Sequence, residues 1–157
     1  MMRRKVNNRN MPPADFMYKS KDLSKFINYV MERGKKNVAE KIVYGVMDDL
    51  KEAAKVKDPI EVFDLALRNV GPMMEVRSRR IGGATYQVPR ELKPERRIAV
   101  AMRWIVAAAK SKKGSPMRKK LTNELIAASK NEGDAIKKRD NTHKMAEANR
   151  AFAHFAW

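Results

Sequence analysis

The residue types best suited to chemistry gather in one stretch of the chain, EVRSRRIGGATYQVPREL at positions 75–92. Its arginines can bind phosphate groups, and the glycine pair behind them could form either a phosphate cradle or the tip of a hairpin. A cradle requires a Walker-type Lys-Ser or Lys-Thr after the glycines, or a dinucleotide-binding fingerprint after a parallel strand. Neither pattern occurs in this sequence, so the stretch favours a β-hairpin.

A two-residue Gly82-Gly83 loop predicts the register of this hairpin over residues 75–89, because such loops need backbone conformations that glycine adopts without strain. The flanking segments contain Val, Ile, Thr and Tyr, which favour strands. Symmetric pairing would join Arg80 with Thr85, Arg79 with Tyr86, and Arg77 with Val88. Neither face is then apolar enough to form a core, and we expect the hairpin to protrude and to stay mobile until its arginines bind a partner.

Two further basic clusters stand at predicted helix starts. Lys35 and Lys36 follow Gly34, where the free N–H groups of a helix N-terminus also attract anions; an ordinary solvated turn is the alternative. Arg118 and Lys119 lie in the first turn of another helix, where the macrodipole disfavours cations by up to about 1 kcal/mol. An external anion would relieve this second cluster.

A third basic feature is a stripe on the predicted helix that begins near residue 93. Arg96, Arg103 and Lys110 recur every seven residues, and Lys113 follows. Small or apolar neighbours along the stripe would let a phosphate backbone approach closely, although a plain solvated face explains the same spacing.

Residue types for catalysis are lacking. The chain has two histidines, His143 and His154, and no cysteine, and no HExxH motif or comparable ligand cluster occurs. The paired acids Asp48 and Asp49 lie among lysines on a predicted helix and are typical of a solvated face. We therefore expect no catalytic residue, no metal, no cofactor and no small-molecule substrate.

Composition indicates a polyanionic partner. The 157 residues include 35 Lys and Arg against 18 Asp and Glu, a net charge of +17. Charge of this size opposes compaction unless a large anion binds it. No apolar run approaches the ~20 residues that span a membrane, the basic start has no apolar stretch behind it, and cysteine is absent. A cytoplasmic protein bound to nucleic acid fits these facts, with no membrane partner.

The charge is also segregated along the chain. Residues 46–65 hold six acids against three lysines, whereas residues 91–120 hold ten bases against two acids. A plain solvated surface intersperses the two signs, so this separation predicts a cationic face and an acidic back.

Hydrophobic periodicity of 3.6 residues predicts a mainly α fold: one domain of about six helices, with the hairpin protruding between the third and fourth. The helices begin near Ser20, Asn37, Asp58, Lys93, Ser115 and Gly133. Asn37 with Glu40 resembles a capping box. The apolar face predicted for this second helix consists of Val38, Ile42, Val46, Leu50 and Ala53.

The two ends of the chain lack the pattern of a packed helix. Residues 1–15 form a basic arm that we expect to fold onto a partner. Residues 147–157 form a tail with three aromatic residues, Phe152, Phe155 and Trp157. These rings could pack back onto the domain, stack on bases, or anchor a neighbouring protein.

Several long motifs in order resemble the bacterial type of small-subunit ribosomal protein seven. They are MERGKKNVAEKIVYG at 31–45, DPIEVFDLALRNVGPMMEVRSRRIGGATYQVP at 58–89 and RRIAVAMRWIVAAA at 96–109. The likeness extends from the basic arm to the FAHFAW ending. It implies a helical protein with a protruding hairpin that binds the 3′ major domain of small-subunit rRNA and nucleates assembly of the subunit head.

The same resemblance implies surroundings for the hairpin and the tail. The hairpin residues Arg79, Arg80, Gly82, Gly83 and Tyr86 would face the exit-site tRNA and the messenger path. The aromatic tail would meet small-subunit protein eleven, with protein nine close by. Some bacterial members of the family also repress translation of their own operon by binding messenger RNA.

Combining the motif matches with the charge geometry gives a set of predicted rRNA-binding residues. It consists of Arg3, Arg4, Lys5, Arg9, Lys35, Lys36, Arg77, Arg79, Arg80, Arg96, Arg103, Lys110, Lys113, Arg118 and Lys119. The competing hypotheses are a DNA-binding architectural protein whose arginine ribbon enters a groove, and a helical scaffold whose aromatic tail binds a protein. The first lacks an evident dimer seam, and the second leaves the arginine clusters unexplained.

Overall fold

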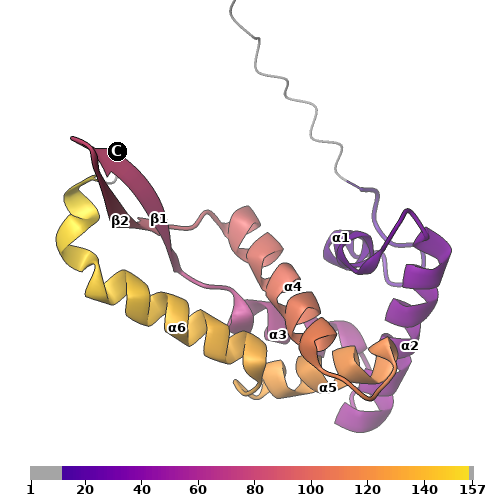
Figure 1. The fold of residues 1–157 in the computed structure, drawn as a ribbon. Helices are drawn as coiled ribbons and strands as arrows, with labels where there is room; N and C mark the ends of the chain where they lie inside the picture. The colour runs from indigo at the N-terminus through magenta and orange to yellow at the C-terminus, as the bar shows by residue number, and fades with distance from the viewer. Residues whose placement is uncertain (1–11, 156–157) are drawn as a thin grey trace, which may run out of the picture.

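The computed structural model describes residues 12–155, which form a mainly helical body with a two-stranded antiparallel hairpin (Figure 1). The elements are α1 (Lys21–Val30), α2 (Lys36–Ala54), α3 (Pro59–Val70), β1 (Met74–Ile81), β2 (Ala84–Glu91), α4 (Pro94–Ser111), α5 (Met117–Ser129), α6 (Asp134–Ala148) and the short 3-10 helix η1 (Arg150–Phe155). The predicted fold class is confirmed, since the hairpin lies between α3 and α4. No helix in this part of the chain is both long and apolar enough to cross a membrane.

Helices α1 to α5 supply most of a shared hydrophobic core. The predicted cap of α1 is present, because the Ser20 hydroxyl accepts a hydrogen bond from the backbone N–H of Leu23 at 3.3 Å. At the centre of the core, the Phe26 ring of α1 meets the Phe63 ring of α3 edge to face, with 5.2 Å between centroids. The predicted apolar face of α1 is buried in full, namely Leu23, Phe26, Ile27 and Val30.

The prediction for α2 is wrong in its start and only partly right in its buried face, because Val46 and Leu50 are buried as predicted. The helix begins at Lys36, so Asn37 lies inside it and forms no capping box. Val38 is 53% exposed, whereas the buried stripe consists of Ala39, Val43, Val46, Met47 and Leu50. A strict spacing of four residues drifts by about 40° per step around a helix of 3.6 residues per turn, and therefore cannot follow one core face.

Side chains from elsewhere in the chain hold the ends of α3 and α5. The guanidinium groups of Arg97 and Arg139 donate to the carbonyl oxygens of Gly71 and Asn69, at 2.8 and 2.6 Å. The Asn69 side chain in turn donates to the Ala128 carbonyl at the end of α5, at 3.0 Å. These bonds satisfy carbonyls that have no partner within their own helix, and the positive charge suits the negative end of the dipole.

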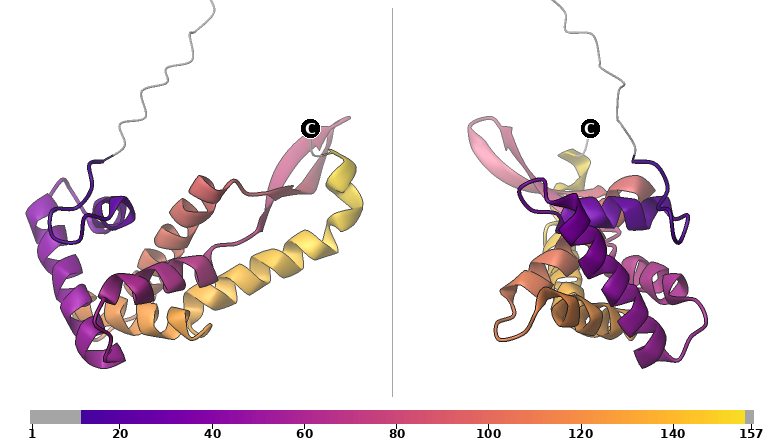
Figure 2. Two further views of the ribbon diagram at one scale, coloured as in Figure 1. Left: turned by 180° about the vertical axis from the view of Figure 1, so that it is seen from behind. Right: turned by 90° about the vertical axis from the view of Figure 1, so that its right-hand side faces the viewer.

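The hairpin has the register that its glycines predict. Arg80 pairs with Thr85, and the other two predicted pairs are also present. Gly82 and Gly83 both have positive φ, at 56° and 90°, as a two-residue hairpin loop requires. The two strands extend away from the helical body at the end opposite α1 and α2 (Figures 1 and 2).

The hairpin is not isolated, contrary to expectation, because the end of the chain folds back beside it (Figure 2). The Tyr86 ring of β2 lies 5.3 Å from the Phe152 ring and 5.4 Å from the Phe155 ring. Arg79 donates to the Phe155 carbonyl at 3.3 Å. The aromatic tail thus supplies the apolar surface that the two strands lack by themselves.

Candidate nucleic-acid interface

A groove of about 750 Å3 runs between α1, the base of the hairpin and the start of α4. Six cationic side chains line it against three carboxylates, and a tyrosine and an alanine lie among them. The cations are Lys25, Arg77, Arg90, Lys93, Arg96 and Arg103. A concave surface with this excess of positive charge attracts a polyanion, because the low-dielectric walls strengthen the field between them.

The groove brings together three of the predicted residues, Arg77, Arg96 and Arg103. Arg96 forms two parallel hydrogen bonds to the Glu75 carboxylate of β1, both at 3.0 Å. This bond with Glu75 raises the pKa of Arg96 above its ordinary value. Arg96 therefore ties the hairpin base to α4, while Arg103 points along α4 and donates to the Ala99 carbonyl at 3.3 Å.

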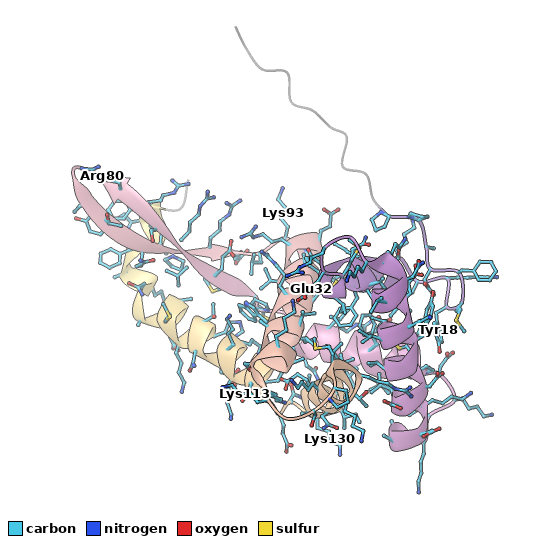
Figure 3. The ribbon with its side chains drawn as sticks, turned by 45° about the vertical axis from the view of Figure 1, so that its right-hand side comes forward. Tyr18, Glu32, Arg80, Lys93, Lys113 and Lys130 are labelled. Carbon is cyan, nitrogen blue, oxygen red and sulfur yellow. The ribbon has the colours of Figure 1, made fainter. Side chains whose placement is uncertain are left out.

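Sequence reasoning missed three of the six groove cations, Lys25, Arg90 and Lys93, and also Tyr29. Arg90 could have been predicted, because the hairpin register places it opposite Glu75. Arg96 forms its hydrogen bonds with this same Glu75. Lys25 and Tyr29 lie on α1, and only the packing of α1 against α4 brings them to this surface. Lys93 lines the groove just before α4, on the upper face in Figure 3.

The predicted Lys35–Lys36 cluster is exposed, in the short connection between α1 and α2 and at the start of α2. An ion pair between Lys110 and Glu32 joins this connection to the far end of α4. Lys110 and its hydrogen bond lower the pKa of the Glu32 carboxyl. The stripe of α4 is thus divided: its first two cations line the groove, and Lys110 lies beside the α1–α2 connection.

Arg118 forms an ion pair with an acidic residue of the same chain. Its guanidinium group forms two hydrogen bonds to the Asp49 carboxylate of α2, at 2.6 and 2.9 Å. These bonds lower the pKa of Asp49. The arrangement depends on Gly45, because a Cβ atom there would lie 2.8 Å from the Arg118 side chain. The cost of a cation in the first turn of α5 is therefore offset by Asp49, whereas Lys119 is exposed.

The remaining predicted residues lie apart from the groove. Arg80 is exposed at the hairpin tip, whereas Lys113 lies on the opposite, lower face (Figure 3). Tyr86 packs against the tail and is half-buried. Five predicted residues lie outside the described part of the chain: Arg3, Arg4, Lys5, Arg9 and Trp157.

Histidine and acidic side chains serve structural contacts in this part of the molecule. His143 accepts a hydrogen bond from the Met73 backbone N–H at 3.1 Å, which fixes α6 to the strand entrance. Glu124 is fully buried, pairs with Lys112, and accepts from the Ala135 N–H at 3.0 Å. Within residues 12–155 no cluster of three or more potential metal ligands occurs. A helical body with a cationic groove and an arginine-bearing hairpin is typical of proteins that bind nucleic acid.

The chain belongs to the family described as Ribosomal protein S7p/S5e, whose family model matches residues 1–150. It is 56% identical to the small ribosomal subunit protein uS7 of Thermotoga neapolitana over 157 residues, which cover both chains in full. It is also 55% identical to the protein of that name from Phenylobacterium zucineum over 155 residues, 99% of this chain and 98% of that one. A third relative so named, from Dictyoglomus turgidum, is 54% identical over 152 residues, 97% of this chain and 96% of the other.

Membership of this family settles the class of function. The protein is a structural, non-enzymatic constituent of the small ribosomal subunit, and it acts in translation within a ribonucleoprotein in the bacterial cytoplasm. Its partners are ribosomal RNA and other ribosomal proteins.

Proposed function

We infer that the groove between α1, the hairpin base and α4 binds the 3′ major domain of small-subunit rRNA and thereby nucleates assembly of the subunit head. The observation that carries this proposal is the convergence of six cations, five from four elements and Lys93 from just before α4, on one concave surface. Because A-form RNA hides its base edges in a deep, narrow groove, a protein recognises folded RNA through backbone, shape and exposed junction bases. Cations on α1, β1, β2 and α4 suit such a junction, where several RNA strands meet.

Two neighbouring features extend this proposed RNA surface. Pro12, the first described residue, lines the groove, and the basic residues Arg3 to Arg9, which precede it in the sequence, are proposed to bind the same RNA. Lys35 and Lys36 would bind phosphates beside the far end of α4. Arg118 is the weakest member of the predicted set, because Asp49 already binds it.

The hairpin tip and the tail are proposed to serve different partners. Arg80 and the Gly82-Gly83 loop are exposed and distant from the helical core, which suits a contact with exit-site tRNA and messenger. The tail that carries Phe152 and Phe155 would contact small-subunit protein eleven, with protein nine nearby. Repression of the protein's own operon would use the same groove on messenger RNA.

A competition experiment tests the proposal. The full chain is bound to a labelled fragment of the rRNA 3′ major domain at physiological salt and challenged with unlabelled fragment, tRNA or duplex DNA. We expect only the unlabelled fragment to compete at concentrations near the Kd, because specific sites bind several orders of magnitude more tightly than non-specific ones. Equal competition by duplex DNA would contradict recognition of rRNA by shape.

A further inference from the structure

The turn between residues 15 and 20, just before α1, presents two large apolar side chains to solvent. Phe16 is 94% exposed and Met17 is 60% exposed. Scattered apolar side chains are common on protein surfaces. Here two neighbours stand on the same turn, and one is an aromatic ring with almost no contact to its own fold.

Hydrogen bonds fix the turn that carries Phe16 and Met17. Asp15 is 93% removed from solvent, and its Oδ2 accepts hydrogen bonds from the backbone N–H groups of Met17 and Tyr18, both at 3.1 Å. Its Oδ1 accepts from the Tyr44 hydroxyl of α2 at 2.7 Å. Backbone bonds from Lys19 to Asp15 and from Asp15 to Ser20 close the turn. The backbone that carries Phe16 and Met17 is thus fixed while their side chains stay exposed, which lowers the entropy cost of binding a partner there.

The electrostatic surroundings of this turn differ from those of the groove. Residues 37–64, on α2 and the following segment, hold seven acids against four lysines in a chain of net charge +17. Burial raises the pKa of Tyr18, and the carboxylates of Asp48, Asp15 and Asp58 raise it further. Within residues 15–22, Lys19 and Lys21 are matched in number by Asp15 and Asp22, so the excess of acids on residues 37–64 remains uncompensated there. Such an excess repels phosphates and attracts cations.

The turn also lies far from the exposed tip of the hairpin. Figure 3 shows Tyr18 at one end of the molecule and Arg80 at the other. A partner at Phe16 therefore need not be the one that binds the tip.

We propose that Phe16 and Met17 form a docking site for a basic, extended segment of another small-subunit protein, whose apolar side chains cover the two residues while its cations face Asp48 and Asp58. The two exposed side chains supply the apolar anchor, and the surrounding carboxylates select a cationic protein rather than RNA. This proposal goes beyond RNA binding and does not depend on the groove.

Photo-crosslinking in assembled subunits tests this docking site. A photoreactive phenylalanine analogue replaces Phe16 in the full chain, which is assembled with purified rRNA and the purified proteins of the small subunit. The same analogue at Met145 of α6, which is 55% exposed, is the matched control. We expect position 16 to cross-link to a peptide rich in Lys and Arg from one other protein, and position 145 to give a different product. A cross-link from position 16 to rRNA, to a peptide without excess positive charge, or to nothing would overturn the proposal.

A pair of variants separates this site from the groove. Phe16→Ser with Met17→Ser should reduce occupancy of the cross-linked protein in assembled subunits at least tenfold, while affinity for the rRNA fragment stays within twofold. Arg103→Ala with Arg90→Ala should weaken the affinity of the protein for the rRNA fragment. The same variant should keep its affinity for a synthetic copy of the peptide that cross-links to position 16. Unaltered occupancy with the Phe16/Met17 variant would show that the two residues are not its anchor.

Discussion

The aromatic contact between the hairpin and the tail gives a prediction whose size follows from the structure. Replacing both tail rings, Phe152→Ala with Phe155→Ala, removes the two contacts of Tyr86, at 5.3 and 5.4 Å between ring centroids. Aromatic pairs contribute about 0.5–1.5 kcal/mol each beyond the area that they bury. The double variant should therefore favour local opening of the hairpin by about 1–3 kcal/mol, since the hairpin has only two strands.

Native-state hydrogen exchange of the full chain measures this change. Because 1.4 kcal/mol is a factor of about ten, amides in residues 77–88 should exchange about 5 to 150 times faster in the double variant. The thermal unfolding of the core should barely move, because Phe26 and Phe63 lie in α1 and α3, away from the tail. Met145→Ala is the control, because Met145 is 55% exposed on α6 and precedes the aromatic tail.

Two results would refute this reasoning. Unchanged exchange across residues 77–88 would mean that the strands are stable without the tail. An equal increase throughout α1 to α5 would mean that the hairpin opens only when the whole molecule unfolds.

Three further predictions concern stability, each checked by thermal unfolding. Tyr44→Phe should lower the free energy of unfolding by about 1–3 kcal/mol, since a buried carboxylate, Asp15, loses one charge-assisted hydrogen bond; an unchanged Tm would show that the bond is dispensable. Asp64→Asn should raise the Tm at pH 7: burial raises the pKa of Asp64 in the folded protein, so its ionised form opposes folding, and the gain should vanish below about pH 4, where both states are protonated. Gly45→Ala displaces Arg118, but the lost surface ion pair, up to about 1 kcal/mol, is offset by about 1 kcal/mol from removing glycine within a helix; the Tm should change little, and a large drop would contradict this balance.

Local chemistry made the hairpin and the ends of several elements predictable. The register around Gly82-Gly83 depends on the turn alone, and the Ser20 cap depends on three adjacent residues. The buried face of α1 follows from periodicity over a short helix. The longer α2 was predicted less well, because a small error in period accumulates along 19 residues and moved Val38 to the wrong face.

Contacts between distant segments could not be read from the sequence. The Arg118–Asp49 pair joins residues 69 positions apart, and nothing near Arg118 indicates an acid on α2. The packing of Tyr86 against the tail likewise requires α6 to run beside β1. The sequence predicted a cationic face and a stripe on α4 but not this groove, because Lys25 reaches it only through the packing of α1.

The central claim is that placement of cations in the groove, and not total charge, carries RNA binding. It is tested most directly by the salt dependence of affinity for the 3′ major domain fragment. The groove variant replaces Lys25, Arg90 and Arg103 by alanine, and the control replaces three exposed lysines of the acid-rich segment 46–65, Lys51, Lys55 and Lys57.

Both variants lose three positive charges, so bulk electrostatics alone would affect them equally. Each phosphate contact contributes about 0.7–0.9 to the slope of log K against log salt concentration. We expect the groove variant to lose about 2–3 from this slope while the control keeps the slope of the unaltered protein. The same slope for groove variant and control would contradict it.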